Sequence, residues 1–517
     1  MSLRIGVDVG GTNTDAVLMD GLTVVAKITT PTTSDVTSGI TTALRHVLDS
    51  SDTAVSAVAG VMIGTTHFTN AVVERQRLEP TAAIRLGLPA TLALPPMVDW
   101  PDDLAEAIGR HAWLCHGGHE FDGREISPLD EGEIERVASE IAGKGISAIA
   151  VSSVFSPVNA SMEERAAEIV RRVIPDAYVT LSSEIGRVGL LERENAAILN
   201  ACLRRLARET VAAFRRAIEE LGITAPLYLT QNDGTLMSAG FAEHYPVLTF
   251  ASGPTNSMRG AAFLSGLKDA MVVDVGGTTS DVGALTHGFP REASVAVDIG
   301  GVRTNFRMPD VFSFGLGGGS LVRDEPLRIG PRSVGYRITE QALVFGGDTL
   351  TTTDVAVAAG VADIGERSRV AHLDPALVRS ALDRIQEMSE AAVDRMKTSA
   401  EPVPVIVVGG GSILIHKPVA GASEMVKPDH YEAANAVGAA IAQISGEVDR
   451  VYSLASMTRD AALDDAKAEA SAKSAEAGAD PATIQIVDVE DVPLAYLPGN
   501  ATRIRVKAVG DLRLASR

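Results

Sequence analysis

The sequence DVGGTTSD at residues 274–281 repeats DVGGTNTD at residues 8–15, with both aspartates at the same spacing. Each copy follows a short apolar run and precedes another, which is the pattern of a buried strand, a Gly-Gly turn and a returning strand. Two such hairpins, placed far apart in the chain, predict two related halves. We expect these halves to face each other with a phosphorylated ligand between them.

The composition narrows the class of protein. The 517 residues indicate two or three domains, and the low aromatic content of 4% favours an α/β protein. A formal net charge of −20 argues against nucleic acid or an anionic membrane as the partner. The two cysteines, Cys115 and Cys202, have no metal-like spacing and fit a reducing compartment. With no membrane-length apolar run and no signal-peptide pattern, we expect a soluble, cytoplasmic protein.

The order of helical and strand patterns predicts three regions. An N-terminal lobe covers residues 1–190, a second lobe covers 191–445, and a small α/β region covers 446–517. Apolar spacing predicts one long helix over 196–221, a strand over 246–250 and a helix over 431–444. In the last region it predicts an alanine-rich helix over 458–477 and strands over 484–492 and 502–509.

The glycine turns suit phosphate binding. A Gly-Gly-Thr hairpin exposes consecutive N–H groups and a hydroxyl, and an aspartate at the strand end can hold Mg²⁺. A third turn, VIVVGGGS at residues 405–412, has neither aspartate nor threonine and suits adenine or ribose. One hairpin would be weak evidence, whereas two matching copies and the third turn are strong. The alternative is a duplicated domain that keeps glycine hairpins for folding.

Other loops allow two interpretations. In GTTHFTNAVVER, residues 64–75, His67 at a helix start could form an anion site, or the loop could simply cap the helix. The glycines of FGLGGGS, residues 314–320, could approach a ligand closely or form a surface turn. His116 and His119 lack a metal-binding spacing and are expected at the surface.

These motifs resemble the actin-like ATPase superfamily and, in detail, the hydantoinase A/oxoprolinase family. GGTNTD at residues 10–15 is similar to the family's opening GGTFTD, and residues 64–75 resemble its GTTxxTNAxxER. NDGTLM at 232–237, SGP at 252–254 and GLGGGS at 315–320 resemble later family motifs in the same order.

The resemblance implies a two-lobed α/β fold of duplicated ribonuclease-H-like domains, with a small C-terminal α/β appendage. It also implies an enzyme that uses ATP and Mg²⁺ to open a cyclic amide or imide, such as a hydantoin or a 5-oxoproline-like lactam, through a phosphorylated carbonyl. Asp8 and Asp274 would hold the metal, and His67, Asn70 and Glu74 would act on the substrate side. The expected nucleotide-binding residues are Gly10, Gly11, Thr12, Thr14, Gly276, Gly277, Thr278, Thr279, Gly317, Gly318, Gly409, Gly410, Gly411 and Ser412.

The sequence also departs from the family. It is shorter than the usual A subunit, lacks the family's GPxCYG segment within residues 321–350, and has Asp233 where glycine is usual. The B half of single-chain oxoprolinases is absent. These differences imply a separate partner subunit, and we expect an oligomer. Two alternative functions are a small-molecule kinase and an ATP-switched activator of a partner enzyme.

Overall fold

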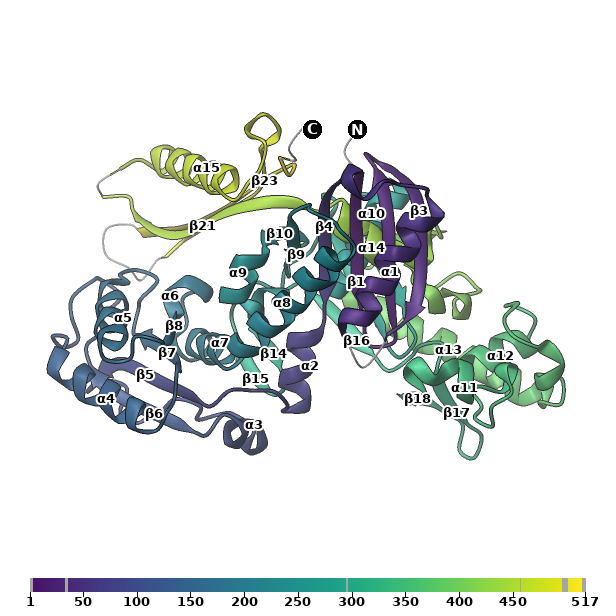
Figure 1. Cartoon of the computed structure of the whole chain (residues 1–517), viewed down its shortest axis with the longest axis horizontal. Helices are drawn as coiled ribbons and strands as arrows, with labels where there is room; N and C mark the ends of the chain where they lie inside the picture. The colour runs from purple at the N-terminus through teal and green to yellow at the C-terminus, as the bar shows by residue number, and fades with distance from the viewer. Residues whose placement is uncertain (1–2, 33–35, 294–295, 456, 495–500, 514–517) are drawn as a thin grey trace.

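Two large sheets form the body of the molecule, and each contains one of the glycine hairpins (Figure 1). The computed structural model describes residues 3–32, 36–293, 296–455, 457–494 and 501–513. Within these residues no helix combines the length and apolar character needed to cross a bilayer.

The first sheet has nine strands in the order β22-β23-β21-β10-β9-β4-β1-β2-β3. β1 and β2 form the first hairpin, β3 is antiparallel to β2, β4 is parallel to β1, and β9 is parallel to β4. The sheet continues across residues 190 and 445, so it does not follow the proposed domain boundaries, which stay predictions. Its strands are β1 (Leu3–Val9), β2 (Asn13–Asp20), β3 (Thr23–Pro31), β4 (Val58–Thr65), β9 (Leu227–Thr230), β10 (Thr235–Ser238), β21 (Gln443–Ser453), β22 (Gln485–Pro493) and β23 (Ala501–Gly510).

The second sheet repeats this order. β11 and β12 form the second hairpin, β16 is antiparallel to β12, β19 is parallel to β11, and β20 is parallel to β19. The order β16-β12-β11-β19-β20 therefore corresponds to β3-β2-β1-β4-β9, and the predicted two-lobed actin-like fold is confirmed. The strands are β11 (Ala270–Val275), β12 (Ser280–Thr286), β13 (Phe289–Pro290), β16 (Val311–Phe314), β19 (Val403–Val408) and β20 (Ala422–Val426).

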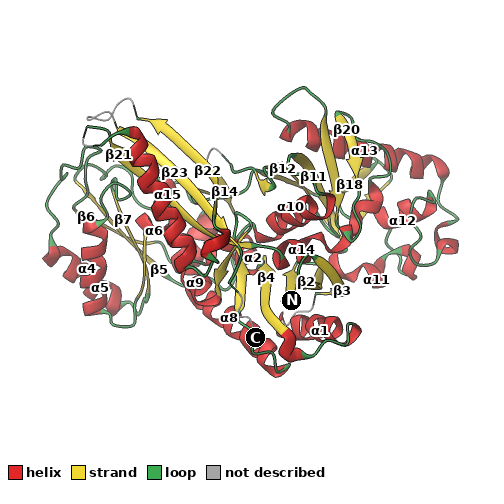
Figure 2. Cartoon of the chain, turned by 90° about the horizontal axis from the view of Figure 1, so that it is seen from above, coloured by secondary structure: helices red, strands yellow, loops and turns green. Residues whose placement is uncertain are grey.

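Helices α10 (Ser252–Ser265) and α14 (Ala434–Ala440) lie between the two sheets (Figure 2). Glycine allows the two helices to touch through their backbones. A Cβ added at Gly260 would lie 1.8 Å from the carbonyl oxygen of Ala434, and one added at Gly438 would lie 1.9 Å from that of Asn256. α14 packs on the first sheet through alanines and Val437, whereas α10 packs on the second through larger side chains such as Met258.

Other helices cover the outer faces and a third sheet. α1 and α8 pack on the first sheet, α12 and α13 on the second, and α15 on β21 and β23. The third sheet, β6-β5-β7-β8, lies between α4 and α5 on one side and α7 on the other. The bounds are α1 (Val36–Ser50), α4 (Glu131–Gly143), α5 (Ser161–Val173), α7 (Leu190–Cys202), α8 (Arg204–Glu220), α12 (Thr352–Ala358), α13 (Pro375–Met396), α15 (Arg459–Glu476), β5 (Thr81–Leu88), β6 (His111–His116), β7 (Ala148–Ser153) and β8 (Tyr178–Leu181).

The remaining elements are short. They are α2 (His67–Glu74), α3 (Asp102–Ala107), α6 (Ser182–Ile185), α9 (Ala239–His244), α11 (Ile338–Gln341), β14 (Val297–Ile299), β15 (Val302–Thr304), β17 (Ser320–Arg323) and β18 (Arg328–Ser333).

Several local predictions were wrong. The helix expected over 196–221 is two helices that meet at Leu203, because α7 packs on the third sheet while α8 packs beside α1. Residues 246–249 form a short 3₁₀ helix, not a strand. The helix expected over 431–444 ends at Ala440, and β21 begins at Gln443. His119 is only 3% exposed and lies 3.2 Å from the Asn159 amide nitrogen.

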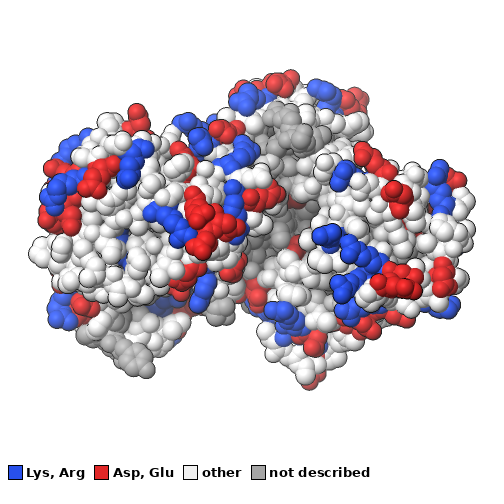
Figure 3. Space-filling view, turned by 90° about the horizontal axis from the view of Figure 1, so that it is seen from below, with Lys and Arg blue, Asp and Glu red and all other residues white. Residues whose placement is uncertain are grey.

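The face seen from below is hollowed between the two halves of the molecule (Figure 3). Acidic and basic side chains are interspersed on this face, so the net charge of −20 does not gather there into one acidic patch.

We expect Gly260→Ala to lower the free energy of unfolding by about 1–3 kcal/mol, because the new Cβ meets a backbone carbonyl that cannot rotate away. Gly240→Ala in α9 is the matched control, since a Cβ added at this helical glycine would have no neighbouring atom within 4 Å. It should be neutral or stabilise by about 0.5–1 kcal/mol. Urea unfolding measures both, and a Gly260→Ala curve equal to wild type would contradict the close helix contact.

Candidate functional site

The tips of the two glycine hairpins touch each other. In each turn the first glycine donates its N–H to the backbone three residues on, from Gly10 to Asn13 at 3.0 Å and from Gly276 to Thr279 at 2.9 Å. The hydroxyls of Thr12 and Thr278 lie 3.2 Å apart, which joins the two halves at this point. The structure therefore brings together the two turns that the sequence pairs.

A pair of aspartates lies at the base of each hairpin. Asp8 is opposite Asp15 in the first, and Asp274 is opposite Asp281 in the second. Burial raises the pKa of Asp8 to about 6, and the charge of Asp274 adds to this shift. Burial, and then the neighbouring carboxylates, raise the pKa values of Asp15 and Asp281 to about 7. Burial also raises the pKa of Asp274.

Two asparagines from the central helices hold the first pair. Asn256 of α10 donates from Nδ2 to Asp8 Oδ1 at 3.2 Å, and Asn435 of α14 donates to Asp8 Oδ2 at 3.2 Å and to Asp15 Oδ2 at 2.8 Å. Sequence reasoning missed both residues. The only available signal for Asn256 was its place just after the SGP motif, and for Asn435 its place in the helix that follows the third glycine turn.

The aspartate pairs are the candidate donors for a divalent cation. Among the ion pairs of the described residues, none involves Asp8, Asp15, Asp274 or Asp281, although all four are held in a largely buried region. No cluster of three or more metal-ligating side chains exists in the described ranges. Mg²⁺ commonly binds through one or two carboxylates and completes its shell with water and substrate phosphates. The donor set therefore fits Mg²⁺ bound together with a phosphate ligand.

The third glycine turn packs against the second hairpin. A Cβ at Gly409, whose φ is +86°, would lie 2.2 Å from Asp274 Oδ1, and one at Gly411 would lie 2.4 Å from the Gly276 carbonyl oxygen. Gly410 has no neighbour within 4 Å of such a Cβ. Of the three glycines, Gly410 therefore leaves open space for a ligand, while the other two permit the close packing. Ser412 is buried, and its hydroxyl has no hydrogen-bond partner.

The glycine loop at residues 315–319 supports the same hairpin. Gly318 and Gly319 donate their N–H groups to the carbonyl oxygens of Gly276 and Gly277 at 3.0 and 2.7 Å, and Gly317 donates to Ser320 Oγ at 2.9 Å. These amides are thus used within the protein. A nucleotide contact by Gly317 or Gly318 stays a prediction, and the role that the geometry itself gives them is to hold the second hairpin.

The three substrate-side candidates lie on α2 but are not gathered at one point. His67 begins the helix, and its Nδ1 lies 2.9 Å from the hydroxyl of Thr65, which ends β4 beside the first hairpin. Burial lowers the pKa of His67, which favours the neutral imidazole. Asn70 is exposed, and Glu74 lies at the other end of the helix, roughly 10 Å along the axis from His67. Only His67 is therefore close to the hairpin.

Two family models match the chain on these elements. The model of the hydantoinase/oxoprolinase N-terminal region matches residues 4–174, and the hydantoinase/oxoprolinase model matches residues 193–401. The chain belongs to the hydantoinase/oxoprolinase family. The first matched region of this family member contains the first hairpin and α2, and the second contains α10 and the second hairpin.

Curated relatives are longer than this family member. It is 28% identical over 435 residues to the caprolactamase subunit alpha of Pseudomonas jessenii, which covers 78% of the chain and 59% of the relative. It is 27% identical over 389 residues to the acetophenone carboxylase gamma subunit of Aromatoleum aromaticum, which covers 69% of the chain and 53% of the relative. The chain thus spans between about half and three-fifths of the length of these relatives.

Two solved structures share the fold of the whole chain. The ATP-dependent caprolactamase from Pseudomonas jessenii superposes with a TM-score of 0.79 at 20% identity, over 99% of this chain and 88% of that one. The nucleotide-free structure of acetone carboxylase, from work on ATP-dependent acetone carboxylation, superposes with a TM-score of 0.71 at 17% identity, over 100% and 89%. At these identities the likeness establishes the architecture.

In metal-free protein, Asp15 should make stability depend on pH. Its pKa is about 7 in the fold against an ordinary 3.8, so the folded state binds this proton more tightly. The stabilisation is complete below about pH 4 and is lost as the pH rises to about 7, by on the order of 2–4 kcal/mol. Urea unfolding at a series of pH values, with EDTA present, gives the free energy of unfolding as a function of pH. This free energy should fall less steeply with rising pH in Asp15→Asn, which keeps the shape of the protonated carboxyl. The exposed control Asp383→Asn should keep the wild-type slope, and equal slopes in all three proteins would contradict this origin.

Proposed function

We propose that this chain is the ATP-binding subunit of an enzyme that opens a cyclic amide or imide. The single observation that carries the proposal is the contact between the two Asp-Val-Gly-Gly-Thr hairpins, with an aspartate pair behind each. Family membership supports it, because one relative of similar fold is named an ATP-dependent caprolactamase. A lactam is a cyclic amide, so the name of this relative supports a cyclic amide as the proposed substrate class of this chain.

Each part of the site has a proposed role. Asp8 and Asp274 hold Mg²⁺, which when bound would neutralise charge on the phosphates. The backbone N–H groups of residues 10–12 and 276–278 bind phosphate oxygens, with the hydroxyls of Thr14 and Thr279 near the ends of the turns. The adenosine lies against residues 409–412, where Gly410 leaves open space. Asn256 and Asn435 keep Asp8 in position as hydrogen-bond donors.

The proposed reaction overcomes the poor reactivity of an amide carbonyl. The amide oxygen attacks the terminal phosphorus of ATP, an O–P bond forms, and ADP leaves. Water then adds to the activated carbon, the ring C–N bond breaks, and a second water releases phosphate from the carboxyl oxygen. The protein contributes alignment and charge stabilisation in this chemistry more than covalent help. His67, neutral and beside the first hairpin, is the best-placed of the substrate-side candidates.

A partner chain is part of the proposal. The relatives are named as subunits, and this chain spans only about half to three-fifths of their length. We propose that a separate subunit completes the substrate site next to α2, where Asn70 and Glu74 are exposed. A kinase that releases a stable phosphorylated product is the second enzymatic candidate, because the facing hairpins would serve it equally well. An ATP-switched activator would need the hairpins but no small substrate.

We expect phosphate release from ATP to increase when a cyclic amide is added. The measurement is a coupled phosphate assay with a panel that includes caprolactam, 5-oxoproline and hydantoin, with and without the proposed partner subunit. Formation of the ring-opened acid at one equivalent per phosphate supports the amide-opening reaction. A stable phosphorylated product would favour the kinase, and equal phosphate release with and without every ring compound would rule out the amide-opening reaction for this panel.

We expect Asp274→Ala to reduce Mg-ATP turnover about 100-fold or more, because it removes a charge that faces the phosphates from the second half. The matched control is Asp383→Ala on the exposed face of α13, where the carboxylate pairs with Lys417 at 3.3 Å. The control should keep wild-type turnover, and circular dichroism should show that both variants fold. Undiminished turnover in Asp274→Ala would remove this aspartate from the site.

A further inference from the structure

A separate cavity of about 540 Å³ lies beneath the C-terminal strands. Its walls come from the segment at residues 183–188, the turn between β9 and β10, helix α9, and the strands β21 and β23. Residues 183–188 and 445–503 lie outside both regions that the family models match. The volume is in the range of small-molecule sites, and no role described above uses this cavity.

One side of the cavity is apolar. Ile185, Leu236, Met237 and Leu248 line its wall, and Val188 and Phe241 lie at its exposed edge. Val188 and Phe241 are each 46% exposed, which is a large exposed fraction for apolar side chains. A ligand with an apolar body would cover this surface and remove it from water.

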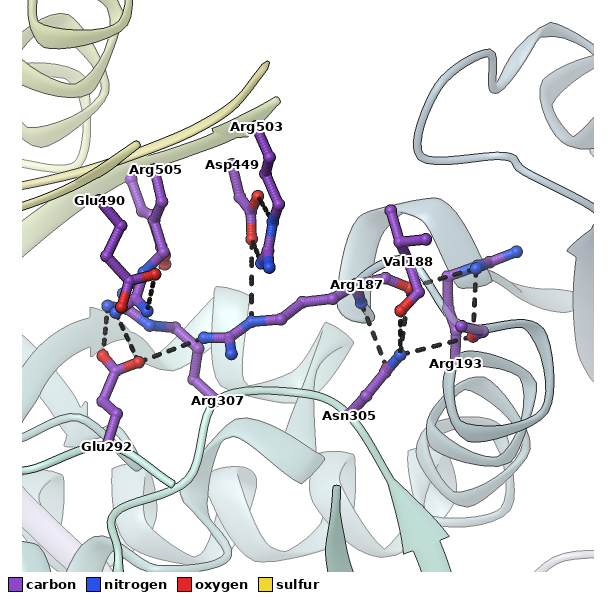
Figure 4. Close-up of polar contacts among 12 residues, drawn as sticks. Arg187, Val188, Arg193, Glu292, Asn305, Arg307, Asp449, Glu490, Arg503 and Arg505 are labelled. Carbon is purple, nitrogen blue, oxygen red and sulfur yellow. Dashed lines mark hydrogen bonds and ion pairs between the residues drawn. The ribbon is translucent and has the colours of Figure 1, made fainter. Parts of the chain in front are cut away.

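The other side carries arginines whose donors are not fully used (Figure 4). Arg187 reaches across from the end of α6, and its guanidinium makes one 3.2 Å contact with Glu292 and one 3.8 Å contact with Asp449. Arg307 pairs with Glu292, Glu447 and, at 3.7 Å, Asp233, and its buried Nε has no hydrogen-bond partner. A guanidinium offers five N–H donors in a fixed fork, so both side chains retain donors for a further acceptor.

The neighbouring charges limit what that acceptor can be. Glu292 and Glu447 are already shared by Arg307 and the buried Arg505, and Asp449 also pairs with Arg503. Of the acidic side chains that line the cavity, Asp233, Glu447 and Asp449 are paired with cations, and Glu184 accepts a hydrogen bond from the Tyr245 hydroxyl at 2.9 Å, while arginine donors remain open. An anionic acceptor fits better than a cation or a neutral group, because charge-assisted bonds to guanidinium are the strongest of these.

We propose that this cavity binds a small organic carboxylate, with the carboxylate on Arg187 and Arg307 and the apolar body against Val188 and Phe241. A carboxylate matches the planar fork of a guanidinium in two parallel hydrogen bonds. The apolar wall distinguishes such an acid from inorganic phosphate, which has no apolar part to bury.

Hydrogen bonds connect the cavity to α10, the helix that carries Asn256. Asn232 lines the cavity, accepts a hydrogen bond from the Ala251 N–H at 2.8 Å, and receives the Thr255 hydroxyl on its carbonyl oxygen at 2.9 Å. The next residue of α10, Asn256, binds Asp8. Opening a cyclic amide yields a carboxylic acid, so the bound acid would be the reaction product or a relative of it. Only this link to turnover rests on the proposed function.

Isothermal titration calorimetry of the full chain with hexanoate and 6-aminohexanoate tests the site. At least one acid should bind saturably, hexanamide should bind about 10- to 100-fold more weakly, and Arg187→Gln should weaken the acid by a similar factor. Val188→Trp should block the edge of the cavity without touching the ion pairs. Arg384→Gln, on the exposed face of α13, is the matched control and should bind the acid as wild type does.

The outcomes separate this site from the nucleotide site. All of these variants should bind Mg-ADP with wild-type affinity, so a loss of acid binding alone assigns the effect to the cavity. If wild type fails to bind Mg-ADP but binds hexanoate, the proposed function fails and the cavity remains. No saturable binding of either acid, unchanged affinity in both Arg187→Gln and Val188→Trp, or phosphate binding as tight as hexanoate would each overturn the proposal.

Discussion

The backbone contact between α10 and α14 holds the candidate site together. Gly260 and Gly438 remove the side-chain layer that normally separates two helices, so each helix touches a carbonyl of the other. α10 carries Asn256 and α14 carries Asn435, and both amides donate to the same carboxylate, Asp8. Because the two helices cannot slide without a clash, the two donors keep a fixed separation, and the position of Asp8 follows from helix packing.

Internal duplication explains why the candidate site has so many carboxylates and why their pKa values are raised. A repeated hairpin brings a repeated aspartate pair, and two halves that face each other place four carboxylates near one another, with Asp8 and Asp15 buried and Asp274 and Asp281 partly exposed. Burial raises the pKa values of all four. Neutral amides and hydroxyls donate to the carboxylates of Asp8, Asp15 and Asp281 without supplying positive charge. The arrangement therefore favours a proton or a metal ion as the missing charge, and it would be unfavourable in a protein that bound neither.

The sequence predicts the architecture well because the hairpins, the apolar strands and the glycine turns are local patterns. The C-terminal helix and its two strands were also predicted, and α15, β22 and β23 lie close to the expected residues. β21 was missed because Gly446 and the charged residues Glu447, Asp449 and Arg450 interrupt its strand pattern. Gly446 is there because α15 packs on it: a Cβ would lie 2.2 Å from the Ala470 carbonyl oxygen.

Tertiary contacts account for what the sequence does not reveal about the site. Asp8 and Asp274 stand out through repetition, whereas Asn256 and Asn435 have no repeated motif and come to Asp8 only when two helices distant in sequence pack together. The glycine loop at residues 317–319 shows the same limit. Its composition suggests a ligand cradle, whereas the hydrogen bonds from Gly318 and Gly319 to the second hairpin are a use that only the fold reveals.

The threonine contact at the hairpin tips has a mechanical consequence. The hydroxyls of Thr12 and Thr278 lie 3.2 Å apart, whereas one phosphate oxygen that accepts from both would hold them up to about 5–6 Å apart, twice an ordinary O–H···O distance. A phosphate oxygen that bound both hydroxyls at this limit would separate the two turns by about 2–3 Å. Since each turn is continuous with its own sheet, such a ligand would move one lobe relative to the other.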